Sequence, residues 1–221
     1  MTTRTTPGVP RAILAVIAAA VAAIALLAGC ASSTPHPART AGSGDHAALT
    51  SQQAPATARH TFDPYTASGR LTVAVTRRTS GSCFSTSIAD PTGSAYRCFA
   101  GNQILDPCFA RPGTGKVAKG GTVACVADPW SKATVLTLTK ALPGRTTPEH
   151  RVWAFLRSDG ARCVAATGTV PAVAGRNLAY NCTDHTAAAL NSTSAKHVRT
   201  VFAKVGATSL RSGTVRELWH S

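Results

Sequence analysis

The pattern of apolar and polar positions divides the chain into three stretches of different character. Residues 12–29 form an uncharged, mostly aliphatic run of 18 residues. Residues 31–60 are almost all Ala, Ser, Thr, Pro, Gly, His and Gln, with Leu49 as the only large aliphatic side chain. Such a composition buries too little apolar surface to offset the entropy of ordering. We therefore expect a signal peptide at 1–29, a disordered linker at 30–66 and a folded domain at 67–221.

The predicted domain shows the alternation that is typical of β-strands. Residues 71–76 alternate large aliphatic with small or polar side chains. The clearest hairpin spans 152–167, because Asp159-Gly160 readily adopts the positive φ angles of a tight turn. Helix has few places to form: 186–191 is short, and 82–90 has room for one turn. Further strands are predicted at 117–126 (a hairpin around Gly120-Gly121), 135–139, 177–182, 198–205 and 215–219. The pattern predicts a mainly β fold, a small disulfide-bonded antiparallel sandwich or open barrel.

The start of the chain predicts export. Arg4 and Arg11 precede the aliphatic run, as in the positive and apolar regions of a signal peptide. The run ends in Leu-Ala-Gly-Cys at 27–30, which matches the bacterial lipobox. We predict cleavage between Gly29 and Cys30, lipidation of Cys30, and a lipid-anchored, extracytoplasmic protein at the cell membrane. An uncleaved transmembrane anchor, which 18 residues also permit, and ordinary secretion stay open.

Six further cysteines lie in the predicted domain: Cys83, Cys98, Cys108, Cys125, Cys163 and Cys182. An even number in an exported chain indicates disulfides, and lipidation accounts for the remaining Cys30. The connectivity is left open by the spacing, but we favour Cys83–Cys98, Cys108–Cys125 and Cys163–Cys182, the last because its members lie on successive predicted strands. A zinc site needs cysteines two to four residues apart, and the closest spacing here is ten. We therefore predict no metal and no cofactor.

The charge of the chain favours anionic partners. Lys and Arg number 23 against 9 acidic residues, and removal of Arg4 and Arg11 would lower the formal net charge from +14 to +12. Outside a cell, such a chain would meet lipid head groups, acidic envelope polymers or envelope proteins and not nucleic acid. The basic residues are scattered along the sequence, which also fits an ordinary solvated surface.

Local catalytic motifs are missing from the sequence. It contains no Gly-x-Ser-x-Gly elbow and no glycine-rich phosphate loop. The Asp-Pro pairs that begin at Asp90, Asp106 and Asp128 are typical of turns capped by the aspartate side chain. Three tryptophans, at 130, 153 and 219, fit core positions better than a sugar-binding platform.

These absences favour a tethered, non-catalytic binding or accessory module of the cell envelope. The alternative is a cell-envelope hydrolase with a non-local active site. A pocket that joins Asp106, Arg97 or a histidine to a nucleophile would favour the hydrolase.

Several short motifs surround the cysteines: SCF at 82–84, AYRC at 95–98, GNQILDPCF at 101–109 and VAC at 123–125. With them, the chain resembles a set of exported and lipid-anchored proteins of actinobacteria. The resemblance extends from about residue 70 to residue 182. It implies an extracytoplasmic location and a disulfide-bonded fold, and it carries over no catalytic residue.

Overall fold

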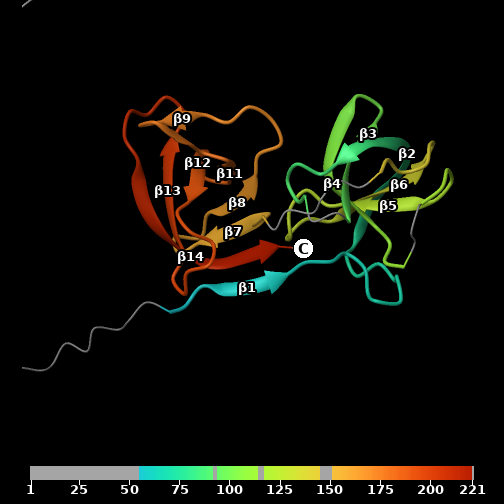
Figure 1. Ribbon diagram of the computed structural model, residues 1–221, viewed down its shortest axis with the longest axis horizontal. Coiled ribbons are helices and arrows are strands. Elements are labelled where there is room, and N and C mark those ends of the chain that lie inside the picture. Colours follow the sequence, from blue (N-terminus) through green and yellow to red (C-terminus); the bar gives the residue numbers. More distant parts are fainter. Residues whose placement is uncertain (1–54, 92–93, 114–116, 145–150, 221) are drawn as a thin grey trace, which may run out of the picture. The chain divides into compact units, whose positions relative to one another are not determined.

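A computed structural model of the chain describes residues 55–91, 94–113, 117–144 and 151–220. Within these residues every regular element is a strand (Figure 1). Three disulfides connect neighbouring strands. The predicted mainly β, disulfide-bonded class is therefore confirmed.

The first sheet is a closed barrel in the order β2-β3-β4-β5-β6. Its strands are β2 (Val75–Thr86), β3 (Ala95–Ala100), β4 (Gln103–Ala110), β5 (Thr122–Cys125) and β6 (Ala133–Leu138). Neighbours are antiparallel except β2 and β6, which are parallel and close the ring. Strand alternation sends Cys98 and Leu136 into the barrel, where both are fully buried, and leaves Phe99 outside.

The second sheet closes as well, because β14 pairs with both β13 and β7. Its order is β1-β14-β13-β12-β11-β8-β7, and a small separate ribbon is made by β9 and β10. The bounds are β1 (Ala58–Thr61), β7 (Ala154–Arg157), β8 (Arg162–Ala165), β9 (Ala172–Val173), β10 (Arg176–Asn177), β11 (Tyr180–Cys182), β12 (Thr186–Leu190), β13 (Arg199–Lys204) and β14 (Arg211–His220).

Several of the predicted elements differ from the structure. The strand expected at 71–76 is a strand only from Val75, where β2 begins, and Leu71 makes an isolated bridge to Tyr65. The expected hairpin at 117–126 is wrong: only β5 is a strand there, and it pairs with β4 and β6 and not with the residues before Gly120. The short helix considered at 186–191 is instead β12, paired on both sides. Its alanines suit either conformation, so the neighbouring strands decide. The hairpin at Asp159-Gly160 is confirmed, with Gly160 at φ +90°.

Part of the segment expected as linker is folded. β1 runs parallel to the second half of β14 and lies beside it (Figure 1). Thr57 is buried just before β1, where its hydroxyl donates to Val215 O at 2.8 Å and accepts from Val198 N at 2.9 Å. These bonds are made mainly to backbone, so they leave little trace in the apolar pattern.

Aromatic side chains join the two sheets into one core. Trp153, fully buried, lies 5.8 Å from Phe109 of the first barrel, measured between ring centroids. Phe62, which follows β1, contacts both rings at 5.7 and 4.9 Å. The predicted core role of Trp153 is confirmed.

In the part of the chain that the structure describes, no helix is long and apolar enough to span a membrane. The predicted cleavage and lipidation residues, Gly29 and Cys30, lie outside the described residues.

Candidate functional site

The six domain cysteines form the three favoured pairs. Cys83–Cys98, Cys108–Cys125 and Cys163–Cys182 each join directly opposed residues of antiparallel strands, with Cα atoms 3.8 to 4.0 Å apart. Cysteines that follow one another in the sequence form these disulfides because the two members of each pair lie on adjacent strands.

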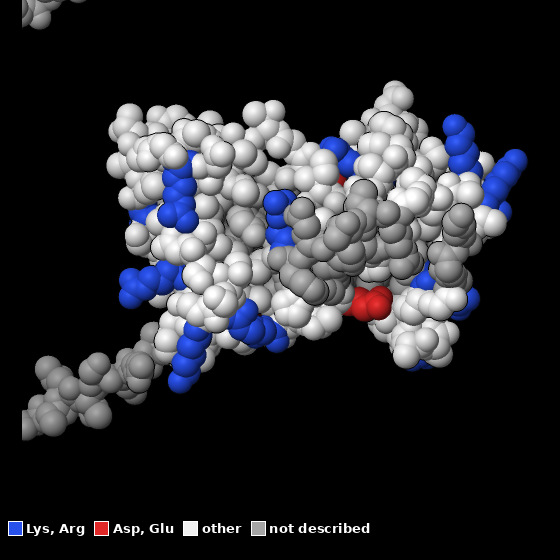
Figure 2. Space-filling view, in the orientation of Figure 1, with Lys and Arg blue, Asp and Glu red and all other residues white. Residues whose placement is uncertain are grey.

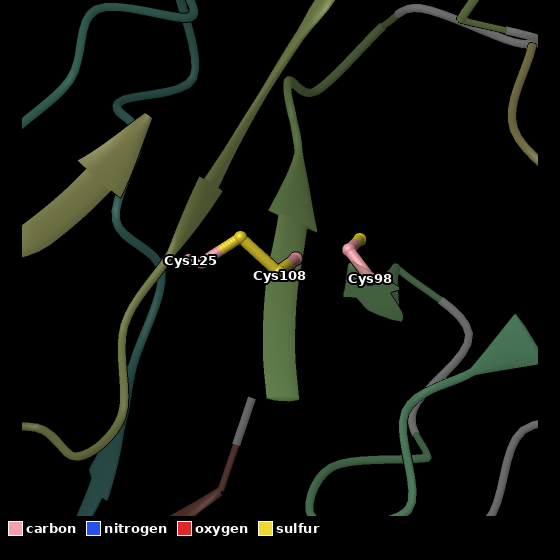
Figure 3. Close-up of side chains that lie close together, drawn as sticks. All are labelled: Cys98, Cys108 and Cys125. Atoms are coloured by element: carbon pink, nitrogen blue, oxygen red, sulfur yellow. A yellow bond between two sulfur atoms is a disulfide. The ribbon is translucent and has the colours of Figure 1, made fainter. Parts of the chain in front are cut away.

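Two of these disulfides lie together inside the first barrel. The Sγ atoms of Cys98, Cys108 and Cys125 are all within 4.8 Å of one another, and Cys98 lies beside the Cys108–Cys125 bond (Figure 3). A metal would need thiolates, but all three sulfurs are engaged in disulfides. In the oxidised protein this cluster is therefore a structural feature of the barrel core.

The outer face of the same barrel carries an exposed apolar patch. Phe84 and Phe99 stack with ring centroids 4.4 Å apart, and Ile104 is the cross-strand partner of Phe99. Their exposed fractions are 43, 40 and 45 %. We call these three residues the Phe patch. The sequence did not predict this patch. Alternation shows which residues share a face of a strand, but which face is exposed depends on the register and on the β2 bulge between Cys83 and Ser85.

Beside the Phe patch, Asp106 is held in a buried polar cluster. It accepts from the Ser87 hydroxyl and from Ile88 N at 3.2 Å, and Arg97 Nε lies 3.6 Å from its Oδ2. Burial raises the pKa of Asp106, although hydrogen bonds from Ser87 and Ile88 and the charge of Arg97 oppose the shift. Arg97 also donates to Thr167 O at 2.8 Å.

This cluster offers little to the hydrolase alternative. Ser87 is only 3 % exposed, and its oxygen already accepts from Asp90 N at 2.9 Å. The neighbouring pocket, about 250 Å³, is lined by Asp106 and Lys132 but not by Ser87. The only serine in contact with Asp106 is therefore buried and does not reach the pocket, within the described residues.

Of the aspartates predicted to cap turns, Asp128 does so and Asp106 does not. Asp128 caps a turn as predicted, accepting from Trp130 N at 2.9 Å and from the Ser131 hydroxyl at 2.6 Å. Asp106 does not, because it lies within β4 and bonds to a distant segment. The prediction for Asp106 was therefore wrong.

One end of the second barrel is closed by a buried arginine. Arg157, 3 % exposed, pairs with Asp159 and, through Nη1, with Asp184 at 3.1 Å. Its guanidinium carbon lies 3.5 Å from the centroid of the Phe202 ring, and Nη1 donates to the Thr186 hydroxyl at 3.0 Å. Two hairpin turns are thereby fixed to the barrel interior.

Three residues that contact this arginine, Asp184, Thr186 and Phe202, also line a pocket of about 410 Å³. Its volume is within the range of small-molecule sites. Its lining combines one carboxylate, two cations and hydroxyl groups on an aromatic base. The residues are Asp184, Thr186, Phe202, Ala203, Lys204, Ala207, Ser209 and Arg211. We call it the barrel-end pocket.

Charge is otherwise spread over the described surface. On the face in Figure 2, Lys and Arg side chains are scattered and not gathered into one patch. Within the described residues, the sulfur cluster is the one group of three or more His, Cys, Asp or Glu side chains whose ligand atoms lie close together, and its sulfurs are bonded in disulfides.

Comparison with known proteins found no matching family model, no similar curated protein and no similar solved structure.

Proposed function

We propose that the chain is an extracytoplasmic lipoprotein, held at the cell membrane by lipidated Cys30, whose barrels act as a non-catalytic binding module of the cell envelope. Three disulfides in so small a body suit an oxidising compartment. The lipobox and the basic composition support the same location.

The Phe patch is the main evidence for a binding role. Three large apolar side chains, each at least 40 % exposed, lie together on adjacent strands. Arg97 forms a polar edge of the patch, with its guanidinium carbon 5.9 Å from the Phe84 ring centroid. A contiguous exposed apolar surface with a polar edge is typical of interaction sites.

The geometry of the patch favours an envelope protein as its partner. Phe84 and Phe99 stack on each other, at an interplanar angle of 24°, so each ring covers a face of the other. A sugar ring packs best on a free aromatic face, whereas exposed ring edges and Ile104 suit apolar side chains of another protein.

The partner is tested by cross-linking in whole cells, comparing the native chain with Phe84→Ser/Phe99→Ser. Val205→Ser is the matched control, because Val205 is 76 % exposed and lies on the second barrel. A cross-linked species that is lost in the double variant and kept in the control supports the proposal. An identical pattern for all three, or sedimentation of the chain with protein-free vesicles that depends on the Phe patch, contradicts a protein partner.

Lipidation is tested separately by mass spectrometry of the mature chain and of Cys30→Ser. We expect an acylated amino-terminal cysteine in the native protein and an unacylated chain in the variant. Detection of an unprocessed amino terminus in the native protein would refute the lipoprotein assignment.

A further inference from the structure

The barrel-end pocket carries two cations with no acidic partner. Lys204 and Arg211 both line it, and within the described residues neither takes part in an ion pair. Arg211 lies over the Phe202 ring, with its guanidinium carbon 5.3 Å from the ring centroid. The two positive charges therefore remain available to an anion from outside the chain.

The carboxylate in the same pocket does not cancel these charges. Asp184 Oδ2 is paired with Arg157 at 3.1 Å, and Asp184 Oδ1 accepts from the Thr186 hydroxyl at 2.7 Å. Arg157 is shared between Asp184 and Asp159, so it offsets only part of the charge of Asp184. Lys204 and Arg211 add two further positive charges, and the three cations outnumber the two carboxylates. The pocket presents a net positive surface that also contains a partly exposed hydrogen-bond acceptor.

The position of these groups is set by the strand register. Thr186 is opposite Lys204, and Phe202 is opposite Arg211, so β12, β13 and β14 bring them to the same end of the barrel. Ser209, in the connection from β13 to β14, adds an exposed hydroxyl. Lys204 and Arg211 lie on paired strands, which hold them more firmly than loops would, whereas Asp184 and Ser209 lie in the adjoining connections.

We infer that the barrel-end pocket binds an anionic, polyhydroxylated unit of a carbohydrate or polyol polymer. Lys204 and Arg211 would bind its carboxylate or phosphate, and Asp184 and Ser209 its hydroxyl groups. Asp184 disfavours a ligand that offers only negative charge, and the two unpaired cations disfavour a neutral sugar. This inference is independent of the Phe patch and of Cys30.

The test uses short oligomers as ligands for the full chain. Galacturonic acid oligomers supply carboxylates, glycerol phosphate oligomers supply phosphates, and galactose oligomers are the neutral control. Binding is followed by titration calorimetry and by amide shifts in NMR spectra. We expect at least one anionic oligomer to bind, with shifts around β12 to β14, and added salt to weaken the affinity.

Variants then separate the pocket from the general charge. Lys204→Gln/Arg211→Gln should weaken binding by roughly tenfold or more. Arg199→Gln is the matched control, since Arg199 is an exposed cation at the opposite end of β13. Lys204→Glu serves as the second variant in case loss of Arg211 from the Phe202 ring disturbs folding.

Three outcomes would overturn the inference. They are equal binding of the neutral oligomer, equal loss in the Arg199 control, and no binding of either anionic oligomer by a folded chain. The Phe84→Ser/Phe99→Ser variant should bind the oligomers normally, so failure of the pocket and failure of the proposed protein-binding role are distinguishable.

Discussion

Replacing Arg157 separates the charge of this buried arginine from its packing. In Arg157→Ala the chain loses two methylenes, each worth about 0.8 kcal/mol when buried, and a cation over Phe202 worth up to about 2 kcal/mol. Asp159 and Asp184 are 54 and 37 % exposed, so both carboxylates can return to water when the arginine is removed. We expect Arg157→Ala to lower the free energy of unfolding by about 3 kcal/mol.

Arg157→Met restores most of the lost apolar volume without the charge. A buried ion pair often contributes little more than a well-packed apolar side chain, so we expect Arg157→Met to cost about 1 kcal/mol. Urea unfolding followed by tryptophan fluorescence measures both values. If Met were as destabilising as Ala, the ion pairs would outweigh the packing and the reasoning would be refuted.

The pH dependence of the same variants checks the electrostatic part. A hydrogen bond from Arg157 lowers the pKa of Asp159. Burial raises the pKa of Asp184, but hydrogen bonds from Thr186 and the charge of Arg157 outweigh it, and the pKa is lowered overall. Lowered carboxyl pKa values stabilise the fold above the unfolded pKa of about 4, and this stability is lost as the pH falls through the folded values.

Stability should therefore fall more steeply between about pH 4 and pH 2 in the native chain than in Arg157→Met. The difference should be below about 1 kcal/mol for each carboxylate, because both are partly exposed and screened. Parallel curves for the two proteins would show that Arg157 does not set these pKa values.

Two further predictions concern the strands themselves. In Gly81→Ala the new Cβ would lie 2.2 Å from the carbonyl oxygen of Phe99, so the free energy of unfolding should fall by about 1–3 kcal/mol. Gly144→Ala is the control: its new Cβ meets nothing within 4 Å, so thermal stability should change little. Cys163→Ala/Cys182→Ala removes the disulfide that closes a loop between residues 19 positions apart. The free energy of unfolding, measured in urea, should fall by about 3 kcal/mol. An unchanged unfolding midpoint would mean that this bond does not restrain the unfolded chain.

Local features of the sequence predicted the fold where neighbours in the chain are also neighbours in space. Asp159-Gly160 predicts its hairpin because the turn geometry is encoded in two residues. The cysteine pairs follow for a similar reason, since Cys108 and Cys125 lie on adjacent strands 17 residues apart. The folded β1 segment was missed because its partner, β14, is more than 150 residues away and supplies mostly backbone hydrogen bonds.

The candidate sites were beyond prediction for the same physical reason. Phe84 and Phe99 were recognisable only as strand residues, because the register and one bulge decide which face of a strand meets water. Lys204 and Arg211 read as ordinary surface cations until β13 and β14 place them in one pocket.

The amino-acid sequence by itself determined that the described part of this chain is rich in β-strands, since this property depends on alternation. For the six cysteines of the domain it favoured pairs of sequence neighbours, and the structure has those pairs. Only the tertiary structure decided that both sheets close, through β2 with β6 and β14 with β7. It also decided which side chains share a surface. Closure and shared surfaces depend on contacts between residues far apart in the sequence, and no local pattern encodes those contacts.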